Sequence, residues 1–150
     1  MEQCIKKVTE FHQHIGAPIR HEPALLPCNE DEAAGISKEL YELIERYGHS
    51  AKQPTEFLNR FLLAAEELAE WAEAHAKQDL VAAADAWGDR MFVLTGDAVS
   101  CGLPAMKIFA EVHRSNMTKL GGDRSESGKG IKSGDFEDPE FGDVLLGDDE

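Results

Sequence analysis

The side chains best suited to chemistry in this chain are carboxylates in two short stretches. The stretch EELAE contains Glu66, Glu67 and Glu70, and the stretch DAWGD begins with Asp85 and ends with Asp89. Residues three or four apart share one face of an α-helix. Each stretch is therefore predicted to present a pair of carboxylates from one helix face, Glu67 with Glu70 in the first and Asp85 with Asp89 in the second.

Both pairs are predicted to lie in apolar surroundings. The helix stripe that holds the first pair starts at Leu63 and ends at Ala74, and the stripe that holds the second starts at Val81 and ends at Phe92. If the stripes face each other inside an antiparallel helix pair, each ionised carboxylate removed from water costs several kcal/mol. A hard divalent ion such as Mg²⁺ or Mn²⁺ offsets this cost because it binds several oxygen ligands. The predicted metal ligands are Glu67, Glu70, Asp85 and Asp89.

The same acids allow two alternatives. Carboxylates on helices commonly form a solvated face, and Glu73, which continues the run, is predicted to be such a surface residue. A ferritin-like di-iron site would need Glu-x-x-His pairs. Neither helix supplies one, since His75 follows Glu70 by five residues and lies on another face. Di-iron chemistry is therefore disfavoured.

Apolar residues recur at helical spacing along most of the chain, and no strand pattern is present. Caps are expected at Asn29 or Asp31, and helix ends at Gly48 and at Gly121. Residues 1–122 are predicted to form an all-α domain of four or five helices, and residues 123–150 an irregular polar arm of that domain. The predicted helices cover about residues 2–15, 29–47, 57–77, 80–101 and 105–120.

Composition excludes several classes of function. The chain has 15 basic and 29 acidic residues, so its net charge of −14 would repel a nucleic-acid backbone. No apolar run approaches the ~18 residues that a membrane span needs, and the N-terminal residues do not resemble a secretory signal. We therefore expect a cytoplasmic protein without nucleic-acid or membrane partners.

The chain resembles the MazG-like, all-α nucleoside triphosphate pyrophosphohydrolases, and within them the phosphoribosyl-ATP pyrophosphohydrolase-like subfamily. The resemblance rests on EFHQHIGAPI, on the unit from EELAE to DAWGDRMFV, and on FAEVHRSNMTKL with the tail GKGIKSGDF. EExxE is loosely specific, whereas FAEVHRSNMTKL after a GLP turn is quite specific. The resemblance implies a helical bundle that dimerises or pairs dimers. It also implies Mg²⁺- or Mn²⁺-dependent cleavage of a nucleoside triphosphate to the monophosphate and pyrophosphate.

The resemblance also implies roles for single residues. Glu67, Glu70 and Asp89 would be metal ligands, and Glu66 would hold a further ion or orient the attacking water. We expect Glu66 to act as the catalytic base. The family's second motif, ExxD, would need glutamate at position 86, where this chain has alanine. The assignment of Asp85 therefore rests on the helix face that it shares with Asp89.

Basic and polar side chains near the end of the last predicted helix suit the phosphates of such a substrate. Arg114 and Lys119 match triphosphate oxygens, and Asn116 matches sugar or base. The alternative is that these cations only favour the helix C-terminus. Lysines of the arm would close over the phosphates or only keep the arm soluble, and His12 would border the base or pack at a helix end. The predicted substrate-binding residues are Arg114, Asn116, Lys119, Lys129, Lys132 and His12.

These features predict hydrolysis of a (d)NTP to (d)NMP and pyrophosphate, in nucleotide-pool sanitation or biasing. We expect a homodimer or homotetramer, because Phe57, Phe61, Leu68 and Met91 belong to apolar stripes that a partner subunit would bury. Two alternatives remain open. One is phosphoribosyl-ATP hydrolysis in histidine synthesis, and the other is a non-catalytic, metal-binding helical module.

Overall fold

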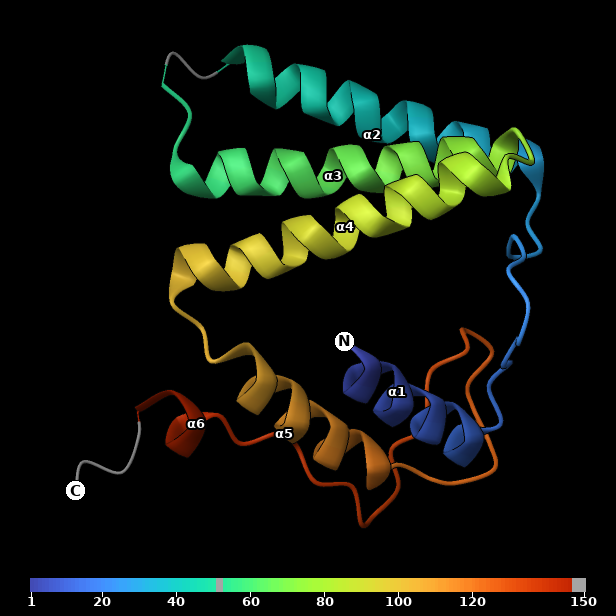
Figure 1. Ribbon diagram of the computed structural model, residues 1–150, viewed down its shortest axis with the longest axis vertical. Helices are drawn as coiled ribbons and strands as arrows, with labels where there is room; N and C mark the ends of the chain where they lie inside the picture. The colour runs from blue at the N-terminus through green and yellow to red at the C-terminus, as the bar shows by residue number, and fades with distance from the viewer. Residues whose placement is uncertain (51–52, 147–150) are drawn as a thin grey trace. The chain divides into compact units, whose positions relative to one another are not determined.

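The computed structural model describes residues 1–50 and 53–146 (Figure 1). Within these residues there is no β-strand, and a single isolated bridge pairs Arg124 with Gly130. The prediction of an all-α fold is therefore confirmed. The helices are α1 (Glu2–Ile15), α2 (Glu30–Ser50), α3 (Glu56–Ala76), α4 (Leu80–Cys101), α5 (Ala105–Met117) and α6 (Gly142–Leu146).

The chain divides into two compact units. Unit 2 is the continuous segment Glu22–Cys101, and unit 1 combines Met1–His21 with Gly102–Glu150. Compactness thus groups the C-terminal arm with α1 and α5. The arm also contains the short helix α6 where the sequence predicted irregular structure. Residues 147–150 of the predicted arm lie outside the described residues.

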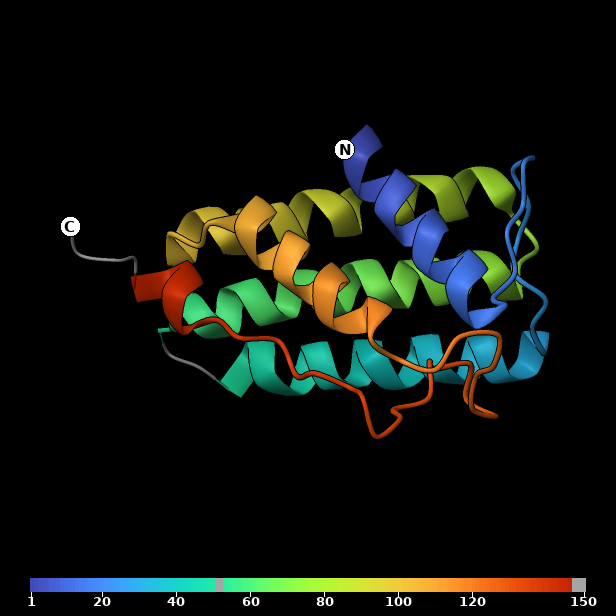
Figure 2. The same ribbon diagram turned by 90° about the horizontal axis from the view of Figure 1, so that it is seen from below.

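In unit 2, helix α3 lies between α2 and α4 and contacts both (Figures 1 and 2). Small residues fill these contacts, because Ala69 is fully buried and Ala65, Ala83 and Ala86 are nearly so. Alanine side chains let helix backbones approach closely, but each contributes little apolar area. Among the described residues no large side chain is fully buried. The unit is therefore held by close backbone approach more than by a bulky core.

An arginine joins α3 to α4 across this small-residue contact. Arg60 donates from Nε to Asp97 Oδ1 at 2.7 Å and from its guanidinium to the carbonyl oxygen of Val93. The guanidinium passes directly over Gly96, where an added Cβ would lie 2.6 Å from Arg60 Nη2. Glycine at this position therefore makes room for the interhelix ion pair.

The start of α2 follows its predicted cap, but two helix ends do not follow the predicted glycines. Asn29 Oδ1 accepts the Glu32 N–H at 3.0 Å, so the cap expected there is confirmed. Helix α2 continues through Gly48, which keeps negative φ and does not stop the helix. Helix α5 ends at Met117, four residues before Gly121, because Thr118 caps it and donates from Oγ1 to the Ser115 carbonyl.

Unit 1 is held together by hydrogen bonds between α1 and the segment after α5. His14 Nε2 lies 2.7 Å from the carbonyl oxygen of Lys119, and the Gly122 N–H donates to the His14 carbonyl at 2.6 Å. The Leu120 N–H donates to the carbonyl of Ile131 at 2.8 Å. These contacts fix the start of the arm against the end of α1.

Within the described ranges, no helix by itself has the length and apolar composition to span a membrane. Of the helices in the described ranges, α4 and α5 together, as a bent pair, reach the length and apolar composition of a membrane span.

Candidate functional site

The carboxylates of α3 and α4 lie close enough to affect one another's ionisation. Burial raises the pKa of Glu67, and the charges of Glu70, Asp89, Glu66 and Asp85 raise it further. Burial likewise raises the pKa of Glu70, followed by the charges of Glu66, Asp89 and Asp85. Like charges disfavour the ionised form of a neighbouring acid. The two helices therefore bring together all five acids that the sequence singled out.

The five carboxylates differ in their depth of burial. Glu67 and Glu70 are half-buried, whereas Glu66, Asp85 and Asp89 are exposed. The sequence led us to expect that all the carboxylates would be enclosed between the helices, but the aspartates are exposed. The reason is that alanines form the contact between α3 and α4, so the α4 stripe lies on the surface of unit 2.

Glu67 stands out because its Oε2 is buried and accepts no hydrogen bond. In the described part of the chain it is the one such side-chain oxygen or nitrogen. No ion pair joins any of the five acids to a basic side chain of these residues. A buried polar atom without a partner costs about 1–3 kcal/mol, and more when it is charged. A cation beside Glu67 would remove this cost.

The donor set fits a hard divalent cation, because it consists of carboxylate oxygens on two adjacent helices. In their present rotamers, no three Asp, Glu, His or Cys side chains of the described residues are already arranged around one point. Binding an ion would therefore require rotation of glutamate or aspartate side chains, and the exposed positions of Asp85 and Asp89 leave room for it. The structure thus shows the carboxylates near one another but not a preassembled cage.

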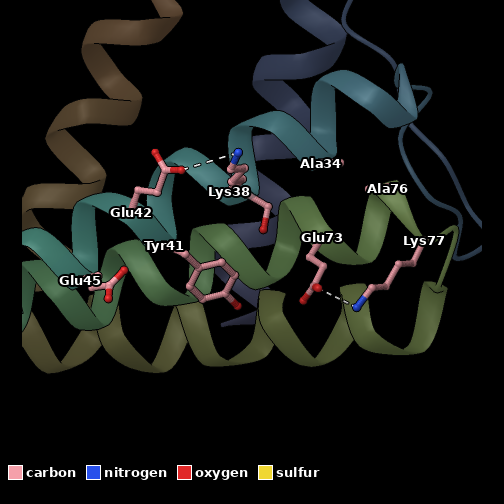
Figure 3. Close-up of a pocket in the computed structure, with 9 residues that line it drawn as sticks. Ala34, Lys38, Tyr41, Glu42, Glu45, Glu73, Ala76 and Lys77 are labelled. Atoms are coloured by element: carbon pink, nitrogen blue, oxygen red, sulfur yellow. Dashed lines mark hydrogen bonds and ion pairs between the residues drawn. The ribbon is translucent and has the colours of Figure 1, made fainter.

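Helix α2 adds a residue that the sequence did not indicate. Tyr41 extends from α2 across α3 (Figure 3), and its pKa is raised by burial and then by Glu70, Glu73 and other acids of α3. A tyrosine in an amphipathic helix carries no signal of this kind, since only the packing of α2 on α3 places its hydroxyl near the acids. We call the surface formed by Glu66, Glu67, Glu70, Asp85 and Asp89 the acidic face. Tyr41 is therefore an additional residue of this acidic face.

Tyr41 also lines a groove of about 600 Å³ between α2 and α3. Two ion pairs border the groove (Figure 3): Lys77 Nζ lies 2.6 Å from Glu73 Oε1, and Lys38 Nζ lies 3.8 Å from Glu42 Oε1. Glu73 is thus paired with an exposed lysine, Lys77, which caps the C-terminus of α3. This distinguishes it from the unpaired acids nearby.

Arg90 is the one basic residue on the central turns of α4, but it faces an aromatic ring. Its guanidinium carbon lies 4.8 Å from the centre of the Trp71 ring, whose other neighbour is the His75 ring at 4.6 Å. His75 is buried and accepts the Leu26 N–H through Nε2 at 3.2 Å. Arg90 and His75 therefore pack on Trp71, and no ion pair joins Arg90 to the acids in the described residues.

Unit 1 contains a pocket of about 710 Å³ between α1 and the start of the arm. The pocket is lined by five of the six residues predicted to bind substrate. They come from the end of α1, from α5 and its C-terminal extension, and from the arm, namely His12, Asn116, Lys119, Lys129 and Lys132.

Some of these side chains already hold one another in place. Lys119 Nζ donates to Asn116 Oδ1 at 2.7 Å. Lys132 Nζ lies 4.1 Å from the centre of the Phe136 ring and 3.1 Å from Asp138 Oδ1. His12 Nδ1 lies 3.0 Å from the carbonyl oxygen of Pro18. The basic groups are thus oriented by neighbouring polar and aromatic groups.

Arg114, the sixth predicted residue, does not line the pocket. Its guanidinium donates to Glu111 at 2.8 and 2.9 Å and also to the Glu137 carboxylate. The hydrogen bond from Arg114 lowers the pKa of Glu111 to about 2. The buried Ser115 donates to the Glu137 carbonyl at 2.7 Å. In this structure Arg114 fastens the arm to α5 instead of facing a ligand.

A family model described as phosphoribosyl-ATP pyrophosphohydrolase matches residues 38–116, which is more than half of the chain. The match includes both acidic stretches and ends at Asn116, before the arm. No curated protein and no solved structure matches the chain.

Proposed function

The chain belongs to the phosphoribosyl-ATP pyrophosphohydrolase family, and from this premise we propose that it is a metal-dependent nucleoside triphosphate pyrophosphohydrolase. The family indicates a pyrophosphohydrolase that acts on a nucleotide-like substrate. The proposed reaction converts a (d)NTP and water to a (d)NMP and pyrophosphate. Such an activity serves to sanitise or bias nucleotide pools.

The observation that carries the metal dependence is the buried, unpartnered Oε2 of Glu67 within a group of mutually repelling acids. We propose that Glu67, Glu70, Asp85 and Asp89 hold Mg²⁺ or Mn²⁺. When bound, such ions neutralise phosphate oxygens and lower the pKa of a coordinated water. The exposed carboxylate of Glu66 is our choice for the base that takes the proton of the attacking water.

The basic pocket of unit 1 supports a substrate rich in phosphate. We propose that Lys119, Lys129 and Lys132 bind the triphosphate and that Asn116 and His12 contact the nucleoside. Positioning and charge stabilisation account for most of the catalysis in phosphoryl transfer. The acids of unit 2 are thus proposed to act through metal, and the cations of unit 1 by direct contact with phosphate.

Exposed apolar side chains support a homodimer or homotetramer. Phe57 is 76% exposed, and Phe61 and Leu68 are also exposed, while Met91 is half-buried. Such a patch on α3 is typical of a surface that another subunit covers. Light scattering of the purified protein would measure the mass directly, and a monomer at working concentrations would contradict this part of the proposal.

Phosphoribosyl-ATP is the second candidate substrate, because the matching family bears that description. One assay separates the candidates. The full chain is incubated with each NTP, each dNTP or phosphoribosyl-ATP, with Mg²⁺ or Mn²⁺, and pyrophosphate and the monophosphate product are measured. Preferred cleavage of phosphoribosyl-ATP would favour the second candidate. Failure to cleave any of them would favour a non-catalytic, metal-binding module.

The site assignment is tested with Glu67→Gln and a matched control, Glu39→Gln. Glu39 is exposed on α2 and lies outside the acidic face. Glu67→Gln should abolish turnover while circular dichroism shows unchanged helix content, and Glu39→Gln should behave as wild type. Full turnover by Glu67→Gln would remove that residue from the metal site.

A further inference from the structure

We propose that the pocket of unit 1 binds a nucleoside triphosphate without divalent metal, with Arg124 as a phosphate ligand and the apolar side of α1 as the platform for the base. The inference rests on the proposed function, because it concerns the same substrate. It goes beyond that function by naming a residue that no motif marked. It also assigns an orientation to the bound nucleotide.

A tight loop presents Arg124 to the pocket. Arg124 and Gly130 form a backbone bridge, and the Ser125 N–H donates to the Lys129 carbonyl at 2.7 Å. Inside the loop, Gly128 adopts a φ of 78°, which favours glycine. The loop therefore holds Arg124 and Lys129 on its two sides, and both line the pocket.

The cations of the pocket differ in whether they already have partners. Lys119 is bonded to Asn116 and Lys132 is paired with Asp138. The side chains of Arg124 and Lys129 have no hydrogen-bond or ion-pair partner among the described residues. Two unpaired cations at one opening are the groups most ready to bind an anion. Arginine in addition matches phosphate oxygens with two parallel hydrogen bonds.

The charge of the pocket opposes the charge of the chain. Four basic side chains line it, and no Asp or Glu is among the described residues of its lining. The chain as a whole has a net charge of −14. A local positive field in an acidic protein raises the local concentration of an anion and orients its approach. A ligand with several negative charges therefore fits this pocket better than a neutral one.

One wall of the pocket is apolar and belongs to α1 and the turn after it. It is formed by Phe11, Ile15, Ala17 and Pro18. The loop packs directly on this wall, because a Cβ at Gly130 would lie 2.9 Å from Lys119 Cδ and 3.3 Å from Phe11 Cζ. The Lys119 ammonium is 5.7 Å from the centre of the Phe11 ring, so the apolar and basic parts adjoin.

This adjacency indicates both the class and the orientation of the ligand. An aromatic and aliphatic wall suits a base, and a basic rim suits a chain of phosphates. A volume of about 710 Å³ lies in the range of pockets that hold small molecules and cofactors. Inorganic phosphate would use only the rim and leave the Phe11 side empty.

The test is calorimetric titration of the full chain in EDTA with dATP, dGTP, dCTP and dTTP separately and with inorganic triphosphate. At least one dNTP should bind, and it should bind about tenfold more tightly than inorganic triphosphate because of the base. Arg124→Gln should weaken that binding about tenfold, as expected for loss of a charge-assisted hydrogen bond. The matched control is Lys107→Gln, an exposed lysine of α5 outside the pocket, which should leave binding unchanged.

Three results would overturn the inference. One is the absence of dNTP binding in EDTA, and another is an equal effect of Arg124→Gln and Lys107→Gln. Equal affinity for inorganic triphosphate and for every dNTP would overturn the placement of the base. Binding in EDTA tests this inference, whereas turnover with Mg²⁺ tests the proposed function, so the two can fail separately. If wild type binds a dNTP in EDTA through Arg124 yet cleaves no nucleotide, the proposed function fails and the pocket assignment stands.

Discussion

The acidic face of unit 2 and the basic pocket of unit 1 are built in contrasting ways. The acidic face gathers like charges from two adjacent helices, and a buried oxygen of Glu67 is left without a partner. The pocket gathers cations from the segment after α5 and from the arm. In the described part of the chain, the side chains of Lys119 and Lys132 are bonded to neighbours, whereas those of Arg124 and Lys129 are not. The first region is therefore expected to need an ion, and the second to accept a ligand as it stands. This difference can be tested by substitution, and the largest effect is expected at Glu70.

Glu70→Gln should lower turnover roughly a hundredfold or more, as loss of a metal ligand generally does. The same change should leave the melting temperature in EDTA equal or higher, because it removes a repelling charge from the acidic face. Mg²⁺ should raise the melting temperature of wild type and have little effect on the variant. Differential scanning calorimetry with and without Mg²⁺ measures the melting temperatures of wild type and variant. A variant that melts well below wild type in EDTA would show a structural role instead.

Lys119→Met should lower kcat/KM for the preferred nucleotide about tenfold, because it removes a phosphate contact while keeping the aliphatic stem. Lys6→Met, an exposed change on α1 outside the pocket, is the matched control. Steady-state kinetics at saturating Mg²⁺ give the values. Identical kinetics for the two variants would remove Lys119 from the substrate site.

Gly96→Ala should be less stable than Gly88→Ala by about 1 kcal/mol, because the new Cβ would lie 2.6 Å from the Arg60 guanidinium and displace it from Asp97. Gly88→Ala, in the same helix, meets no atom within 4 Å and should be neutral or stabilising by up to about 1 kcal/mol. Urea unfolding followed by circular dichroism compares them. Equal stability of the two variants would show that the Arg60 contact contributes little.

Glu111→Gln should have the smallest effect, a slight decrease in melting temperature that depends on pH. The pKa of Glu111 is lowered from 4.5 to about 2 by Arg114. A lowered carboxyl pKa stabilises the fold above about pH 4.5, and the effect is lost as the pH falls towards 2. The difference between wild type and variant should therefore be present at pH 6 and shrink towards pH 2.5. A difference that is constant across this range would contradict the assignment.

The positions of the acids could be predicted because helix spacing is a local property of the sequence. Glu67 and Glu70 lie three residues apart and must share a face once the helix forms, as Asp85 and Asp89 must at four residues. Their depth of burial could not be predicted in the same way. It depends on which side of α4 packs against α3, and alanines instead of the acidic stripe make that contact.

Among the substrate-binding candidates, too, some positions could be predicted from the sequence and others could not. Lys119 and Asn116 belong to one short motif, and the structure places both at the pocket. Arg114 belongs to that motif too, and its ion pair with Glu111 follows from their three-residue spacing on α5. Its contact with Glu137 of the arm does not follow from any spacing. Arg124 lies in a polar stretch without any motif, and only the fold of the loop brings it to the pocket.

By itself the sequence determined the helices, most of their ends and the faces on which the acids lie, because hydrogen bonds and side-chain spacing within a helix involve near neighbours in the chain. The tertiary structure decided that Tyr41 lies beside the acids, that Arg114 holds the arm and that Arg124 lines the pocket. Those outcomes depend on contacts between segments far apart in sequence, and the free energies of such contacts are set by packing and charge in three dimensions.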